Sequence, residues 1–111
     1  MELYKEFIKE TGGRECVYND KYFYTYTING EVFYLENVFI KKEHRNNGIV
    51  DNIIEEAYNL AKECNCKYLT SSACLNSFKN IIQRTDHILT RNGFKIYKTD
   101  DYMVDYVKEI K

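Results

Sequence analysis

The sequence contains no proline and only 5 glycines, and it has no hydrophobic run near the roughly 20 residues that a membrane-spanning helix needs. It also has no excess of charge, because 16 lysines and arginines nearly balance 17 aspartates and glutamates. This balance argues against a nucleic-acid-binding protein, which needs a basic surface. The 11 tyrosines and 6 phenylalanines argue against disorder. We therefore expect one globular domain over residues 1–111, with no nucleic-acid or membrane partner.

No export signal or metal motif is predicted either. The segment 1–10 is charged and amphipathic, unlike a signal peptide, so we expect a cytoplasmic protein with reduced thiols. Only one residue separates Cys64 from Cys66, whereas zinc knuckles separate their cysteines by two. We expect Cys64 and Cys74 to be small buried apolar groups and predict no metal.

Hydrophobic spacing and turn residues divide the chain into alternating helices and strands. A short N-terminal helix (1–13) precedes a core (14–111), and Leu3, Phe7 and Ile8 share one face of that helix. Further helices are predicted at 49–64 and 78–91, and strands at 16–18, 21–28, 31–40, 67–75, 94–98 and 102–107.

The pair Asn29-Gly30 predicts a β-hairpin with a type I′ turn, in which both central residues have positive φ. The second strand of this hairpin, 31–40, has few polar residues, which favours burial on both faces and a central place in a sheet. The alternating tyrosines Tyr22, Tyr24 and Tyr26 suit either sheet packing or a binding surface for an acceptor or partner.

Strand 31–40, helix 49–64 and strand 67–75 form a βαβ unit, which requires a parallel pair joined by a right-handed crossover. The remaining hairpins are antiparallel, so the fold class is α/β with a mixed sheet. Within the unit, Gly48 lies between a buried strand and a helix N-terminus. Unpaired N–H groups and the helix dipole favour an anion there, and Arg45 adds positive charge.

The segment 40–50, IKKEHRNNGIV, resembles the acyl-CoA signature V-x-P-E-x-R/Q-x-x-G-x-G/A of the GNAT N-acetyltransferase superfamily. The segment 84–94, RTDHILTRNGF, resembles the second hallmark of that family, R-x-x-A-H-x-F-Y-x-x-x-G-F. The resemblance covers about residues 22–108. It implies a mostly antiparallel sheet flanked by helices, with a splayed parallel strand pair at the βαβ unit.

The resemblance further implies an acetyltransferase that moves the acetyl group of acetyl-CoA, without a metal, to a primary amine of a small molecule or a protein. Glu36 lies on the strand where this family sometimes places its base, and the alternative is a carboxylate that simply faces solvent at the strand end. Because the unperturbed pKa of histidine is near neutrality, His87 suits either a proton shuttle or a packing or capping role on its helix. The strand would bind the pantetheine arm, the loop would bind the diphosphate, and Asn76 would reach the arm. The implied cofactor-binding residues are Val38, Phe39, Ile40, Arg45, Asn46, Asn47, Gly48, Ile49, Val50 and Asn76.

Three positions depart from the family pattern. Lys42 replaces the proline, a change that we expect to be harmless. Val50 replaces a glycine or alanine and places two methyl groups where the diphosphate would approach, and Leu89 replaces a tyrosine that often protonates the leaving thiolate. His87, Tyr97, Tyr102 or solvent could replace that acid. These departures keep an alternative open, a non-catalytic binding or regulatory module with a GNAT fold, encoded by a bacterium or a phage. Aromatic side chains on a short sheet are also compatible with a homodimer.

Overall fold

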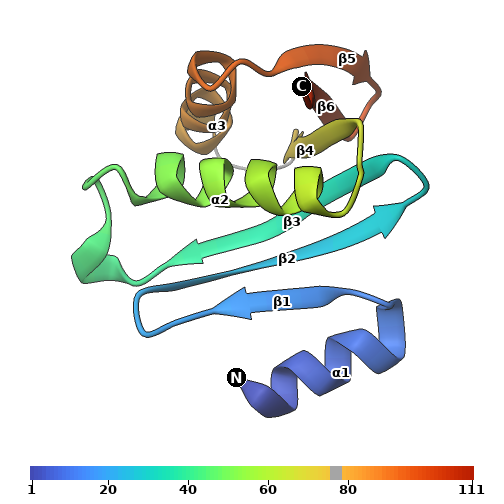
Figure 1. Cartoon of the computed structure of the whole chain (residues 1–111). Coiled ribbons are helices and arrows are strands. Elements are labelled where there is room, and N and C mark those ends of the chain that lie inside the picture. The colour runs from blue at the N-terminus through green and yellow to red at the C-terminus, as the bar shows by residue number, and fades with distance from the viewer. Residues whose placement is uncertain (76–78) are drawn as a thin grey trace.

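A computed structural model describes residues 1–75 and 79–111 as one six-stranded sheet with three helices (Figure 1). The strand order is β1-β2-β3-β4-β6-β5, and only β3 and β4 run parallel. This confirms the predicted mixed α/β sheet. The elements are α1 (Glu2–Gly12), β1 (Glu15–Tyr18), β2 (Tyr22–Asn29), β3 (Val32–Ile40), the short 3-10 helix η1 (Lys42–His44), α2 (Ile49–Glu63), β4 (Tyr68–Cys74), α3 (Lys79–Arg91), β5 (Lys95–Thr99) and β6 (Met103–Glu109).

The predicted hairpin joins β2 and β3, but its turn lies one residue further along the chain than expected. Asn29 pairs with Val32, so the connecting residues are Gly30 and Glu31. Only Gly30 has a positive φ, 61°, which excludes the type I′ turn predicted from the sequence. Asn29 remains in the extended strand, and the single glycine supplies the left-handed conformation that the connection needs.

One hydrophobic core lies between the sheet and the helices α2 and α3 (Figure 1). Helix α2 contributes Ile53, Ile54, Ala57 and Ala61, because these positions recur at helical spacing on one face. Helix α3 contributes Leu89. The two helices therefore cover the same face of the sheet.

The tyrosines of β2 serve packing, which was one of the two interpretations of their spacing. Tyr24 is fully buried and Tyr22 is half-buried, and the hydroxyls of both donate to the carboxylate of Glu56 on α2, each at 2.8 Å. Tyr26 stacks on Phe33 with 4.5 Å between ring centroids. Burial and the Glu56 carboxylate together raise the pKa of the Tyr24 hydroxyl.

Strand β3 occupies the predicted central position, but the prediction that both its faces are buried is wrong. Phe33 and Leu35 are buried beneath α2, whereas Val38 and Phe39 are 39% and 49% exposed. Tyr24 pairs with Val38 and Tyr26 pairs with Leu35. Between these two pairs β3 therefore carries one more residue than β2, which is a β-bulge near Glu36. The exposed half of β3 begins at this bulge.

Helix α1 lies at the β1 edge of the sheet (Figure 1), and only part of its apolar face is buried. Ile8 is buried, but Leu3 and Phe7 are 79% and 61% exposed. Tyr4 packs edge-on against Phe23 on the face of the sheet away from α2. Across residues 1–75 and 79–111, no helix has both the length and the apolarity to cross a membrane.

The cysteine prediction was also wrong in its choice of residues. Cys64 and Cys74 are exposed, and Cys16 and Cys66 are the buried thiols. Cys64 caps the end of α2, where the chain leaves the core. Among the described residues, no three His, Cys, Asp or Glu side chains gather as a metal site would require.

Candidate functional site

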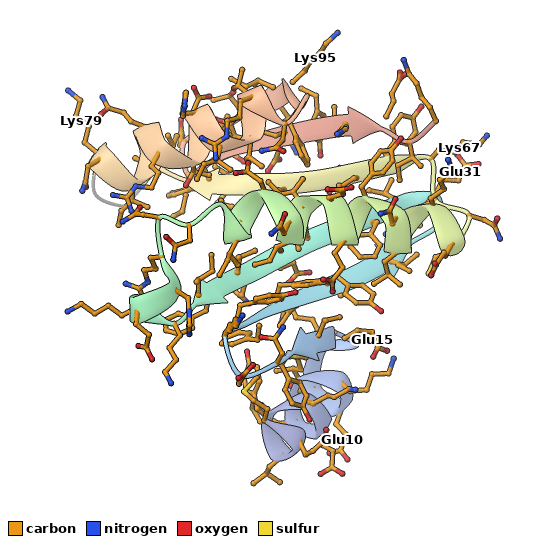
Figure 2. All side chains as sticks on the ribbon, turned by 60° about the vertical axis from the view of Figure 1, so that its left-hand side comes forward. Glu10, Glu15, Glu31, Lys67, Lys79 and Lys95 are labelled. Atoms are coloured by element: carbon orange, nitrogen blue, oxygen red, sulfur yellow. The ribbon has the colours of Figure 1, made fainter. Side chains whose placement is uncertain are left out.

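The parallel strands β3 and β4 pair over only three residues and then separate. The pairs run from Val32 with Tyr68 to Tyr34 with Thr70, although β3 continues to Ile40 and β4 to Cys74. At the paired end, the backbone N–H of Lys67 donates to the carbonyl of Glu31 at 2.7 Å. The side chains of these two residues form an ion pair at 3.2 Å and lie together in Figure 2. The strand pair is thus closed at one end and open at the other.

A cavity of about 800 Å³ occupies the open end. Its walls come from β3, the loop after β3, the start of α2, the open half of β4 and one side of α3. The lining residues are Leu35, Glu36, Val38, Phe39, Ile40, His44, Arg45, Asn46, Gly48, Ile49, Val50, Ile54, Ser71, Ser72, Ile81, Arg84, Thr85, His87, Ile88, Leu89 and Arg91.

The edge of β3 that faces this cavity presents unpaired backbone groups. On the opposite edge the N–H of Lys41 donates to the carbonyl of Lys21, the residue before β2, at 2.8 Å. Because alternate residues of a strand direct their N–H and C=O groups to opposite edges, those of Val38 and Ile40 point toward the cavity. The carbonyl of Ile40 accepts a hydrogen bond from Arg45 Nε at 2.8 Å. An extended ligand could pair with the remaining groups in the manner of an added strand.

At its wide end the cavity meets the N-terminus of α2. Asn46 and Gly48 have positive φ angles of 65° and 76°, and this conformation turns the chain sharply into the helix. None of the backbone N–H groups from Asn46 to Asp51 donates to another described residue. A Cβ atom at Gly48 would meet open space, so the approach to these groups is clear. Asn47 belongs to this loop but is not a lining residue.

The charge around the cavity is mainly positive. Arg45, Arg84, Arg91 and two histidines line it, whereas Glu36 is the single acidic lining residue among those described. The guanidinium of Arg45 lies 5.4 Å from the centroid of the Phe39 ring, which fixes it beside the end of β3. Cationic side chains combined with free helix N–H groups favour a ligand with several negative charges.

Asp51 lies in the first turn of α2 and is bound by residues at the end of α3. Its carboxylate accepts hydrogen bonds from Asn92 Nδ2 at 2.8 Å and from Arg91 Nη2 at 2.8 Å. These partners lower the pKa of the Asp51 carboxyl, the hydrogen bond from Asn92 first and that from Arg91 second. The contact joins the start of α2 to the end of α3, and Arg91 neutralises an acid next to the anion-favouring loop.

Val50 does not fill the cavity. Its side chain is half-buried and packs against the core, and the residue also lines the cavity wall. The space beside the loop is therefore present despite the two methyl groups that depart from the family pattern.

The structure places both predicted catalytic residues on the wall of the cavity, in different settings. Glu36 is hydrogen-bonded by Thr27 Oγ1 at 2.9 Å and ion-paired with Arg14, and 26% of its side chain is exposed. His87 is exposed on α3 and faces the cavity without a hydrogen-bonded partner among the described residues.

The other candidate acids lie elsewhere. Leu89 is 4% exposed within the core, so its position is a packing position in this chain. Tyr97 and Tyr102 belong to the last hairpin and do not line the cavity. Asn76 lies outside the described residues.

Sequence reasoning missed part of the site. Ser71 and Ser72 line the β4 side of the cavity and were not among the predicted site residues. Arg84 and Arg91 were contained in the second family-like segment but were given no role. The signal was available, because two arginines seven residues apart on a helix fall on the same face.

The resemblance to GNAT proteins is confirmed at the level of the fold. Similar structures include a nourseothricin acetyltransferase (17% identity, 90% of this chain and 67% of the other, TM-score 0.73). They also include a Bacillus subtilis acetyltransferase in complex with CoA (15% identity, 99% of this chain and 86% of the other, TM-score 0.72). A third is a GNAT-family acetyltransferase from Elizabethkingia anophelis with acetyl-CoA bound (17% identity, 95% of this chain and 82% of the other, TM-score 0.73). This chain has the GNAT fold.

Sequence comparison adds nothing to this conclusion. No protein-family model matches the chain, and no curated protein is detectably similar in sequence. The chain spans between 57% and 86% of the lengths of the similar structures.

Proposed function

We propose that the chain is an acetyltransferase that uses acetyl-CoA and acetylates a primary amine. The observation that carries this proposal is the cavity between the separated strands β3 and β4, which ends at the free N–H groups of α2. Two proteins of similar fold contain CoA or acetyl-CoA, which supports the same class of ligand here.

The residues present fit such a ligand. The loop from Asn46 to Val50 would hold the diphosphate with its N–H groups, and Arg45 and Arg84 would supply charge. Val38 and Ile40 would pair with the amide groups of the pantetheine arm. The strand from Glu36 to Ile40 advances by about 13 Å, so the arm would leave the thioester near the closed end of the strand pair.

The proposed chemistry needs one proton acceptor and one proton donor. Acetyl-CoA, as the co-substrate, would supply the acetyl group as a thioester. Glu36 would accept a proton from the acceptor's ammonium group, and the freed nitrogen lone pair would form a bond to the carbonyl carbon. As the carbon–sulfur bond breaks, His87 would protonate the sulfur and the nitrogen would lose its second proton. The products are an amide, a thiol and one released proton.

Thermal denaturation with and without CoA tests the proposal directly. At a CoA concentration 100 times its dissociation constant, we expect a stabilisation of about 2.7 kcal/mol and a rise in Tm of roughly 10 °C. Gly48→Asp and Gly48→Asn form a matched pair, because both residues tolerate the positive φ and only Asp adds a negative charge. The Asp variant should lose most of the CoA effect, and the Asn variant should keep more of it. No rise in Tm with CoA would refute the proposal.

A further inference from the structure

Ser72 and Asp105 form a hydrogen-bonded pair beside the closed end of the cavity. They lie directly opposite each other in the register of β4 and β6, and Ser72 Oγ donates to Asp105 Oδ1 at 2.5 Å. Ser72 lines the cavity, and the half-buried Asp105 lies behind it. The single hydroxyl proton of Ser72 is therefore engaged in the hydrogen bond to Asp105.

The position of this pair relates it to the thioester. Glu36 and Ser72 come two residues after the last paired residues of their strands, Tyr34 and Thr70. Both line the same cavity, one from each arm of the separated strands. An acetyl group carried to the closed end of the cavity would therefore lie between Glu36 and Ser72.

The charge of Asp105 has no counter-ion in the part of the chain that is described. No lysine, arginine or histidine nitrogen lies within 4 Å of its carboxylate, and Lys98, its opposite residue on β5, makes no ion pair with it. In contrast, Glu36 is neutralised by Arg14. Burial and then the negative charge of Asp105 raise the pKa of the nearby Tyr97 hydroxyl. The uncompensated charge at this end of the cavity is negative.

We propose that Ser72 and Asp105 select the acceptor, and that the acceptor is an alkylammonium ion such as a polyamine or a lysine side chain. This inference rests on the proposed acetyl transfer. With its proton donated to Asp105, Ser72 can only accept a hydrogen bond, so it favours an N–H donor from the acceptor. Asp105 is a positioning residue that orients Ser72 and attracts positive charge. An α-amino acid would bring its carboxylate close to Asp105 and is disfavoured.

The test is steady-state release of CoA from acetyl-CoA with three acceptors: spermidine, Nα-acetyl-lysine methylamide and glycine. The first two distinguish a polyamine from a peptide lysine, and glycine is the zwitterionic comparison. The variants are Ser72→Ala, Ser72→Thr and Asp105→Asn. Asp101→Asn is the matched control, because it removes the same charge from an exposed position in the turn of the same hairpin.

We expect both cationic acceptors to be used at least 10-fold more efficiently than glycine. Ser72→Ala and Asp105→Asn should each raise the KM for the preferred acceptor about 10-fold, with KM for acetyl-CoA and the CoA-induced rise in Tm kept within twofold. Ser72→Thr retains the hydroxyl and should recover most of the loss, and Asp101→Asn should behave as the parent chain. Added salt should raise the acceptor KM of the parent more than that of Asp105→Asn, a difference that a purely structural role would not produce.

Several outcomes would overturn the inference. One is a preference for glycine, and another is an unchanged acceptor KM in both Ser72→Ala and Asp105→Asn. If CoA raises Tm but none of the three amines is acetylated, the acceptor assignment fails while cofactor binding stands. If CoA has no effect on Tm, the proposed function fails and the inference fails with it.

Discussion

The ion pair between Asp51 and Arg91 gives the sharpest prediction about the proposed CoA site. We expect Arg91→Gln to weaken CoA binding even if Arg91 never touches the ligand, because the change removes the positive partner of the Asp51 carboxylate, which then carries an uncompensated charge near the N–H groups of α2 while Asn92 still donates to it. Asp51→Asn should leave CoA binding unchanged or stronger. The double variant Asp51→Asn/Arg91→Gln should therefore bind CoA better than Arg91→Gln alone.

The magnitudes follow from exposure and charge. The side chains of Arg91 and Asp51 are 44% and 36% exposed, so solvent screens the pair and its loss should cost about 1 kcal/mol, or about 4 °C in Tm. A carboxylate without its counter-ion near a diphosphate repels it by about 1–2 kcal/mol, which is about 10-fold in the dissociation constant. Because the pKa of Asp51 is lowered in the folded state, the ionised carboxylate contributes fully to the free energy of unfolding above about pH 4. It is lost as the pH falls through the folded-state pKa.

Calorimetric titration with CoA at low ionic strength measures these affinities, and Arg84→Gln provides the control. Arg84 also lines the cavity but does not pair with Asp51, so adding Asp51→Asn to Arg84→Gln should recover much less affinity. The reasoning is refuted if the Asp51→Asn/Arg91→Gln double variant binds as weakly as Arg91→Gln. In that case Arg91 itself would contact the ligand.

Two further predictions concern Tyr106 and Glu36. Burial and the hydrogen bond to Asp86 raise the pKa of Tyr106 from 10.0 to about 12. The contribution of this raised pKa to the free energy of unfolding is therefore complete below pH 10. It is lost as the pH rises toward 12, at about 1.4 kcal/mol per pH unit. Urea denaturation at pH 8 should show that Tyr106→Phe is about 1 kcal/mol less stable than the parent chain. Between pH 8 and 11 its free energy of unfolding should fall less steeply than that of the parent. An equally steep fall would contradict a raised pKa for Tyr106. Glu36→Gln should lower kcat about 100-fold with the KM for acetyl-CoA unchanged, and a normal kcat would limit Glu36 to its contacts with Arg14 and Thr27.

Much of the fold could be predicted because local patterns encode it. The helical spacing of Ile53, Ala57 and Ala61 and the glycine of the β2–β3 turn identify their elements without tertiary information. The order of the last strands could not be predicted. β6 lies between β4 and β5, and a hairpin alone does not determine which of its two strands pairs with the rest of the sheet.

Burial was the least predictable property, since it depends on which faces the helices cover. Both Phe33 and Phe39 are large apolar residues of β3, but the bulge near Glu36 and the position of α2 leave one buried and the other half exposed. The loop 45–50 could be identified because backbone geometry and a sequence pattern coincide there. The pairing of Ser72 with Asp105 could not, because 33 residues separate them and only the β4–β6 register brings them together.

The short parallel pairing between β3 and β4 has a mechanical consequence. Three residue pairs connect the two halves of the sheet, with α2 spanning the crossover between them. An extended ligand bonded to Val38 and Ile40 would add backbone hydrogen bonds along the part of β3 that does not pair with β4. Ligand binding should therefore make the connection between β3 and β4 more rigid. Release of the product should require this connection to become flexible again.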